Sequence, residues 1–292
     1  MSKILITGGT GLVGKRLTTL LLEKQHDVVI LSRNPKKKNE YKWDISKNYI
    51  DEDAFINVDY IIHLAGAGVA NKRWTDKRKQ LIIDSRVQTA NLLFKKIKEN
   101  QIDLKGFISA SGSNYYGAKT SEKIYTEDDN SGNDFLGKVC VAWENAALQF
   151  EQLGIPVTIL RTGVVLSQKG GALQKMITPV ISPLGSGEQY MPWIHIDDLC
   201  EMYAHCVTQN CADIYNAVAP DFNTNKEFSK KLAKAVKRPF LPIKVPAFIL
   251  KIILGELAVI LLEGSRLSSK KIEKKGYVFQ FNSLEKALAN LF

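Results

Sequence analysis

The chain has 292 residues, 45% of them hydrophobic and 24% charged, proportions that are typical of a soluble globular protein and exclude disordered or collagen-like chains. Its four cysteines are too few for a disulfide scaffold and form no Cys-x-x-Cys pair, so we expect no metal site and a reducing, cytoplasmic compartment. The formal net charge is +10, but the lysines are scattered among helical and turn segments, so we expect no nucleic-acid partner.

Short apolar segments alternate with longer amphipathic segments in the first part of the chain. The apolar runs do not alternate with polar residues, which is typical of strands that are covered on both faces. The predicted strands are residues 3–7, 27–32, 59–64, 106–111 and 156–161. The predicted helices are residues 11–24, 75–100 and 135–153. This alternation predicts an α/β protein with a doubly wound, parallel Rossmann sheet.

The pattern becomes less regular after Gly163, where prolines and glycines interrupt the chain. We predict that residues 1–165 form the Rossmann domain and residues 166–292 a smaller C-terminal lobe on the substrate side, with some segments returning to the main sheet. The apolar stretch 245–262 contains Pro246, Lys251 and Glu256, too many interruptions for a membrane span. It predicts two short amphipathic core helices within a helical tail at 245–292, and no membrane partner.

A glycine-rich turn follows the first predicted strand and precedes the first predicted helix. In Thr7-Gly8-Gly9-Thr10-Gly11-Leu12-Val13-Gly14, the first glycine allows a tight turn, the second a close backbone approach, and the third close packing of the helix. The free N–H groups of the helix then face an anion. The motif predicts a dinucleotide site at Gly8, Thr10, Gly11, Leu12, Val13 and Gly14.

The second predicted strand ends at Ser32-Arg33, where NAD-binding sites usually have an acidic residue for the ribose hydroxyl. A hydroxyl and a guanidinium would instead bind a 2′-phosphate, which favours NADP(H) over NAD(H). The alternative is that Arg33 is an exposed loop residue. Asp44 either lies near the adenine or caps a helix that begins at Ile45.

Small residues at Leu64-Ala65-Gly66 end the next predicted strand and would let a dinucleotide lie across its tip. His63 lies inside this strand and is interpreted as a core histidine. Arg86, on the following helix, either reaches the cofactor phosphates or forms a surface ion pair.

Together with further motifs, these residues resemble extended or atypical short-chain dehydrogenase/reductases. The additional segments are 109–117, Ser-Ala-Ser-Gly-Ser-Asn-Tyr-Tyr-Gly, 160–166, Leu-Arg-Thr-Gly-Val-Val-Leu, and 193–199, Trp-Ile-His-Ile-Asp-Asp-Leu. The whole chain is similar to the epimerase-family branch typified by the YfcH protein and by short-chain dehydrogenase family 39U. This resemblance implies an epimerase-like Rossmann fold, NADP binding with Ser109 and Val165 near the nicotinamide, and no assigned reaction.

The resemblance also implies a catalytic Tyr-x-x-x-Lys pair on the helix of residues 135–153, but this chain departs from it. Alignment on Glu144 puts Leu136 at the tyrosine position and Cys140 at the lysine position, and neither can replace the usual residue. Tyr115 and Lys119 have the right spacing, but the intervening Gly117-Ala118 favours a loop.

The remaining catalytic candidates are Ser111, to orient the substrate oxygen, and Tyr115 or Tyr116 as proton donor, with Lys138 as the neighbouring cation. The alternative for the two tyrosines is aromatic packing over the cofactor. His195 and Asp197 either form an acid–base pair or belong to a segment in which Asp197 or Asp198 caps a helix beginning at Leu199.

Two functions agree with this pattern. The first is an NADP(H)-dependent oxidoreductase or epimerase with a non-standard active site and a small-molecule substrate. The second is a non-catalytic NADP(H)-binding redox sensor that has lost the Tyr/Lys pair. The sequence leaves open whether the chain forms a homodimer through its long helices, as many relatives do.

Overall fold

Eight strands form the central sheet of the protein, whose computed structural model describes residues 1–292. Their spatial order is β11-β8-β6-β5-β1-β2-β3-β4, and every neighbouring pair is parallel except β3 and β4. The strands are β1 (Lys3–Thr7), β2 (Asp27–Ser32), β3 (Glu40–Asp44), β4 (Tyr49–Ile50), β5 (Tyr60–His63), β6 (Gly106–Gly112), β8 (Val157–Thr162) and β11 (Ile214–Ala217). The predicted α/β Rossmann fold is confirmed.

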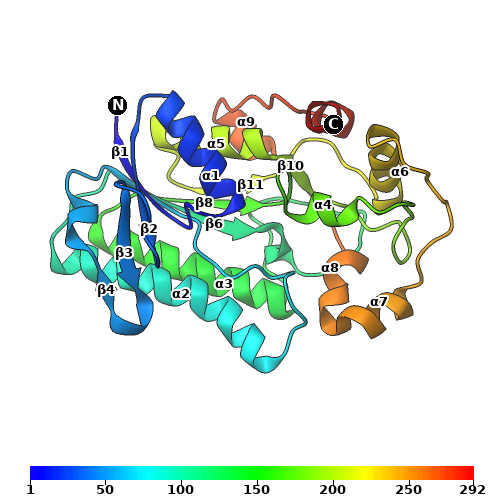
Figure 1. Ribbon diagram of the computed structural model, residues 1–292, viewed down its shortest axis with the longest axis horizontal. Helices are drawn as coiled ribbons and strands as arrows, with labels where there is room; N and C mark the ends of the chain where they lie inside the picture. Colours follow the sequence, from blue (N-terminus) through cyan, green and yellow to red (C-terminus); the bar gives the residue numbers. More distant parts are fainter.

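Helices cover both faces of this sheet (Figure 1). One face carries α1 (Leu12–Glu23) and α5 (Ile196–Gln209), and the other carries α2 (Asp76–Glu99) and α3 (Phe135–Leu148), which continues into the 3₁₀ helix η4 (Gln149–Leu153). Alternate residues of β1 point to opposite faces. Ile4 and Ile6 belong to the core under α1 and α5, whereas Leu5 belongs to the core under α2 and α3.

The chain beyond residue 165 contributes one strand to the main sheet and forms further small sheets and helices outside it. Strand β11 pairs with β8 at the sheet edge, so this segment returns to the main sheet. Two small parallel sheets pair β9 (Val164–Leu166) with β10 (Trp193–His195) and β7 (Ile124–Tyr125) with β12 (Arg266–Leu267). The remaining helices are α4 (Ala172–Met176), α6 (Asn225–Ala235), α7 (Ala247–Leu254), α8 (Val259–Leu262), α9 (Lys270–Lys274) and α10 (Leu284–Leu291). The domain boundaries at 165 and 245 remain predictions.

Four further short 3₁₀ helices lie between the main elements. They are η1 (Ile45–Lys47), η2 (Glu52–Phe55), η3 (Ser113–Tyr116) and η5 (Gly255–Ala258). None of the helices is both long and apolar enough to cross a bilayer.

The structure corrects the expectation that residues 245–262 form two core helices. No residue of α7 is buried. Phe248, Ile252 and Ile253 are 63%, 69% and 60% exposed.

Strand β3 was not predicted, because its sequence, Glu-Tyr-Lys-Trp-Asp, is short and largely polar.

Asp198 connects α5 to the C-terminal segment. Its buried carboxylate accepts the backbone N–H groups of Gln280 at 2.8 Å and Phe281 at 2.9 Å, and lies 3.1 Å from the hydroxyl of Tyr277. We expect Asp198→Ala to lower the free energy of unfolding by about 2–3 kcal/mol, because it leaves buried donors unpaired. Urea denaturation measures this, and the exposed Asp103→Ala variant is the control. A loss equal to that of the control would contradict the role.

Candidate active site

The glycine-rich turn joins β1 to α1 in a backbone path that side chains would block. Gly8 has φ +71°, and a Cβ atom there would lie 2.9 Å from the backbone carbonyl carbon of Leu64. A Cβ on Gly14 would collide with the carbonyl oxygen of Gly8. The Gly11 N–H donates to the Gly8 carbonyl at 3.0 Å and closes the turn. These contacts explain why glycine occupies these positions.

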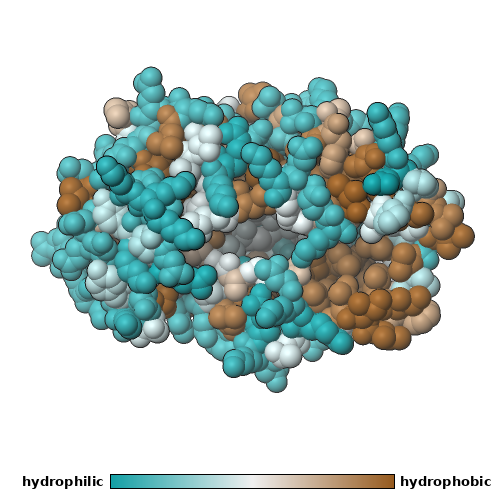
Figure 2. Space-filling view, viewed as in Figure 1, coloured by the Kyte–Doolittle hydropathy of each residue, from teal (hydrophilic) through white to brown (hydrophobic).

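No side chain caps the first turn of α1, which begins at Leu12 after Gly11. Its first N–H groups and the positive end of its dipole are therefore available to an anion. Thr10 and Gly11 are exposed at this end of the helix. In the view of Figure 2, the surface is hollowed beside the start of α1 and the ends of β6 and β8.

Thr7 fixes the tip of β5 against that of β1. Its Oγ1 accepts the backbone N–H groups of Leu64 and Ala65, each at 3.2 Å, and lies 2.8 Å from Nδ1 of His63. Complete burial lowers the pKa of His63 to about 4, so the ring is neutral at pH 7. The interpretation of His63 as a core histidine is confirmed.

Four of the predicted cofactor residues lie together at the edge of one core cluster. Leu12, Val13, Leu64 and Val165 are partly buried and pack against the residues between the sheet and α1 and α5. Residues from α1, the β5 tip and β9 thus meet where the parallel strands end. Ser109 differs from them: it is fully buried, and its hydroxyl donates to the carbonyl of Ala110 at 3.0 Å.

Arg86 is buried beneath the loop that follows β5. Its Nη1 donates to the carbonyls of Ile82 at 2.8 Å and Ala67 at 3.1 Å, and its guanidinium lies 4.7 Å from the ring centroid of Trp143. Burial lowers the pKa of Arg86 to about 10. No carboxylate lies within 4.0 Å of it, so the alternative of a surface ion pair is wrong. A buried cation without a carboxylate suits a site that receives an anion.

Lys42 of β3 lies beside the end of β2. Ser32 is opposite Lys42 in the register of the two strands, and Nζ of Lys42 donates to the carbonyl of the exposed Arg33 at 2.6 Å. The hydroxyl of Ser32 accepts the backbone N–H of Asn34 at 3.2 Å. Sequence reasoning missed Lys42, because only the unpredicted strand β3 brings it beside Arg33.

Asp44 caps the short helix η1. Its Oδ1 accepts the Ser46 hydroxyl at 2.7 Å and the Ser46 backbone N–H at 3.1 Å. These hydrogen bonds favour the ionised carboxylate and lower the pKa of Asp44. Of the two alternatives for this residue, the helix cap therefore agrees with the structure.

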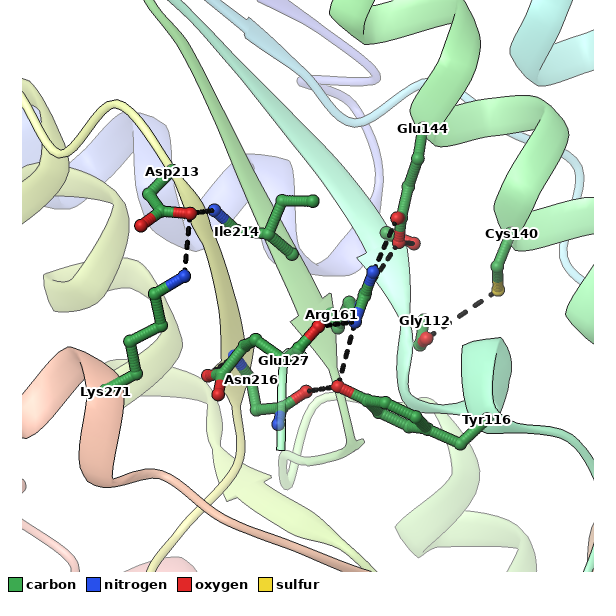
Figure 3. A network of polar contacts seen from close by, with 11 residues as sticks. Gly112, Tyr116, Glu127, Cys140, Glu144, Arg161, Asp213, Ile214, Asn216 and Lys271 are labelled. Atoms are coloured by element: carbon green, nitrogen blue, oxygen red, sulfur yellow. Dashed lines mark hydrogen bonds and ion pairs between the residues drawn. The ribbon is translucent and has the colours of Figure 1, made fainter. Parts of the chain in front are cut away.

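A buried charge network lies beneath the segment with the predicted catalytic residues (Figure 3). The pairing of β6 with β8 puts Ser111 opposite Arg161, and α3 supplies Glu144. Arg161 donates to Glu144 from Nε at 3.0 Å and from Nη2 at 2.9 Å, and the Ser111 hydroxyl donates to Glu144 Oε1 at 2.7 Å. Burial alone would lower the pKa of Arg161, but Glu144 raises it above its usual value.

Both candidate tyrosines contact Arg161. The Tyr116 hydroxyl donates to Asn216 Oδ1 at 2.7 Å and accepts from Arg161 Nη1 at 2.9 Å. Burial raises the pKa of Tyr116. The ring centroid of Tyr115 lies 3.3 Å from the guanidinium carbon of Arg161. Sequence reasoning missed this network, although a charged residue within the apolar strand β8 was a signal for it.

The residues that were expected to assist a tyrosine do not contact either one. Lys138 is exposed on α3, so the prediction that it is the neighbouring cation is wrong. The cation beside both tyrosine rings is the guanidinium of Arg161. The helix η3 ends at Tyr116, and Gly117 has φ +85°. Lys119 therefore follows in a loop, as expected, and does not share a helix with Tyr115.

Leu136 and Cys140 occupy the first turns of α3, where the resemblance implies a tyrosine and a lysine. Both are buried. The Cys140 thiol lies 3.6 Å from the carbonyl of Gly112, and burial raises its pKa to about 12, with Glu144 adding to the shift. The thiol is thus neutral at pH 7, and neither side chain supplies a proton donor or a cation.

His195 and Asp197 have structural contacts of their own. His195 is buried, its ring centroid lies 3.8 Å from that of Phe281, and its Nδ1 accepts the backbone N–H of Asp197 at 3.1 Å. Asp197 Oδ1 pairs with Arg16 at 2.6 Å, whereas its Oδ2 lies 4.0 Å from His195 Nδ1. Helix α5 begins at Ile196 with His195 as its cap, so the expectation of an aspartate cap before Leu199 is wrong. Burial lowers the pKa of His195, which favours the neutral ring.

A cavity of about 750 Å³ separates the start of α3 from α7, η5 and α8. Leu136 and Phe135 line one side, and Ala247, Ala258 and Leu262 line the other. The polar lining includes Asp134, Lys251 and Glu256. This size and mixed lining suit a small organic ligand.

Comparison with known proteins agrees with this geometry. A family model described as the NAD dependent epimerase/dehydratase family matches residues 4–217, and one described as a domain of unknown function, DUF1731, matches residues 245–291. An epimerase family protein of Mycobacterium bovis is 34% identical over 98% of this chain and 96% of its own. One from Staphylococcus aureus is 34% identical over 100% of this chain and 99% of its own.

A solved structure is also similar over its full length. The crystal structure of the human epimerase family protein SDR39U1 with NADPH has a TM-score of 0.87 and 31% identity, covering 99% of this chain and 98% of that one. The resemblance inferred from the sequence motifs is confirmed. The chain belongs to the NAD dependent epimerase/dehydratase family.

Proposed function

We propose that the protein binds NADP(H) along the carboxyl ends of β1, β2 and β5. The observation that carries this proposal is the uncapped start of α1, which the glycine-rich turn leaves accessible to a pyrophosphate. Arg86, buried without a carboxylate partner, adds positive charge under the neighbouring loop. The similar human protein was crystallised with NADPH, which supports the same cofactor here.

The preference for NADP(H) over NAD(H) rests on Ser32, Arg33 and Lys42. Both side chains are exposed, and the ammonium group of Lys42 is held beside the backbone of Arg33 by its hydrogen bond to the Arg33 carbonyl. Charge-assisted hydrogen bonds to a phosphate contribute about 1.5–3 kcal/mol each. An unphosphorylated ribose would gain little from them, because it has no charge to pair with.

Replacing either cation is expected to remove this selectivity. Arg33→Ala and Lys42→Ala should each weaken NADPH binding roughly 10- to 100-fold and change NADH binding less than about 3-fold. Fluorescence titration with both nucleotides measures the effect. Lys47→Ala, an exposed lysine on η1, is the matched control. Equal weakening of both nucleotides would contradict a 2′-phosphate site.

We further propose that the protein is an oxidoreductase or epimerase that works without the usual Tyr-x-x-x-Lys pair. Bound NADP(H) would supply or accept a hydride at its nicotinamide. Tyr115 is the proposed proton donor, because the Tyr116 hydroxyl is occupied by Asn216 and Arg161. Arg161, stacked on Tyr115, would offset negative charge on that phenol. Ser111 would orient the substrate oxygen by accepting a hydrogen bond from a substrate hydroxyl, because its own hydrogen is donated to Glu144.

Tyr115→Phe tests this assignment. It should abolish NADPH-dependent turnover of a panel of small carbonyl compounds and leave NADPH affinity within about 3-fold, because the ring and its stacking on Arg161 are kept. The panel spans carbonyl compounds of different polarity, because the cavity beside Leu136 has a mixed lining. Turnover by the variant equal to that of the parent protein would contradict the role of Tyr115.

A non-catalytic NADP(H) sensor is the second candidate, and one observation favours it. The Ser111 hydroxyl donates its hydrogen to Glu144 and the Tyr116 hydroxyl donates its hydrogen to Asn216, so neither has one left to donate to a substrate carbonyl. A sensor would distinguish NADPH from NADP⁺ in affinity and would oxidise no NADPH over the whole panel.

A further inference from the structure

Helix α7 presents its apolar side chains to solvent, unlike an ordinary surface helix of a globular protein. The side chains of Phe248, Ile249, Ile252 and Ile253 follow one another at helical spacing and are 63%, 37%, 69% and 60% exposed. Ile243, just before the helix, is 68% exposed. Figure 2 shows the resulting apolar surface over α7 and α8 at one end of the molecule. Exposed apolar surfaces of this kind mark interaction sites.

The same end of the molecule carries a segment with a large excess of basic over acidic residues. Between residues 226 and 254 there are eight basic residues and one acidic residue, a formal charge of +7 out of the total of +10. Six of these basic residues are exposed and have no carboxylate within 4.0 Å: Lys226, Lys230, Lys234, Lys237, Arg238 and Lys251. Helix α6 and the segment that leads to α7 carry five of them (Figure 1).

We propose that this end of the molecule, residues 226–254, docks on the surface of a bilayer that contains anionic lipids. Side chains of α7 would enter the interface between headgroups and acyl chains, and the exposed basic residues of α6 and of the segment before α7 would contact lipid phosphates. Stable peripheral binding requires two such contributions, apolar insertion and attraction between basic residues and anionic lipid, and this end supplies both. The proposal replaces the expectation of no membrane partner and does not depend on the proposed cofactor or reaction.

The charge selects a bilayer over a second copy of the chain as the occupant. Two copies that met through this end would bring together the six unpaired basic residues of each copy, which electrostatic repulsion opposes. A surface of anionic headgroups is instead complementary in charge to the basic residues of this end. Docking would also place the cavity next to the lipid, because Ala247 and Lys251 of α7 line that cavity.

Vesicle flotation tests the proposal with the full chain. We expect the protein to float with phosphatidylcholine vesicles that contain 30% phosphatidylglycerol and to remain unbound with phosphatidylcholine alone. Raising the salt from about 0.1 M to 0.5 M should weaken binding, because screening shortens the range of attraction. Ile252→Glu should lower the partition coefficient at least 10-fold, and Phe248→Glu, one helical turn away, should do the same.

The controls separate docking from loss of the fold and from self-association. Val278→Glu introduces the same charge at a valine that is 84% exposed outside this segment, and it should bind vesicles as the parent protein does. Thermal unfolding of all three variants should stay within about 3 °C of the parent, since the replaced side chains are exposed. The proposal is overturned if the parent protein does not float with the anionic vesicles. It is overturned equally if light scattering shows a dimer that Ile252→Glu dissociates.

Discussion

Glu144→Ala is expected to lower the free energy of unfolding by about 3–5 kcal/mol, the largest loss that we predict for a single substitution. The change removes the carboxylate that accepts two hydrogen bonds from Arg161 and one from Ser111. Arg161 is only 2% exposed, so its guanidinium would stay buried without a counter-charge. Urea denaturation at pH 7 measures the loss: the midpoint of the transition should fall, and the slope of the free energy of unfolding against urea concentration should stay unchanged.

Two further variants distinguish the loss of a counter-charge from the loss of a side chain. Glu151→Ala removes an exposed carboxylate just beyond the same helix and should change stability by less than about 0.5 kcal/mol. The double variant Glu144→Met with Arg161→Met should be more stable than Glu144→Ala alone, because it removes the unpaired charge together with its partner. A double variant less stable than Glu144→Ala would contradict this account.

Local sequence patterns predicted the elements that hold the cofactor site. The turn from Gly8 to Gly14 requires only that a strand precede it and a helix follow it, and both neighbours are adjacent in the chain. The predicted strand at residues 27–32 and the helix at 75–100 also agree with β2 and α2, because their apolar and capping signals lie within a few residues. The fold and the phosphate-binding turn could therefore be predicted.

The features that the sequence did not predict depend on contacts between distant segments. Lys42 approaches Arg33 only because β3 adds to the sheet beside β2. Glu144 and Arg161 meet through the packing of α3 on β8. Helix α7 shows the same limit, because apolar periodicity identifies an apolar face but cannot say whether another element covers it. These properties follow from tertiary structure, not from local pattern.

Thr10→Asp is expected to weaken NADPH binding at least about 100-fold, which corresponds to roughly 2.7 kcal/mol. Thr10 is exposed in the turn before α1, where we propose that the pyrophosphate lies. A carboxylate there would occupy the uncapped N–H groups and repel the phosphates. The fold should be kept, because a negative charge near the start of a helix is favourable to the helix. Fluorescence titration of NADPH measures the affinity.

The matched control for this effect is Thr19→Asp, which adds the same charge to the same helix. Thr19 is exposed in the middle of α1, two turns from its start, and donates only to the carbonyl of Lys15. NADPH affinity of this variant should stay within about 3-fold of the parent, because exposed charges at this distance are largely screened. If both aspartates weakened NADPH equally, net charge and not the helix start would govern binding. If Thr10→Asp bound NADPH as tightly as the parent, the pyrophosphate would have to lie elsewhere, because the uncapped turn cannot hold two anions at once.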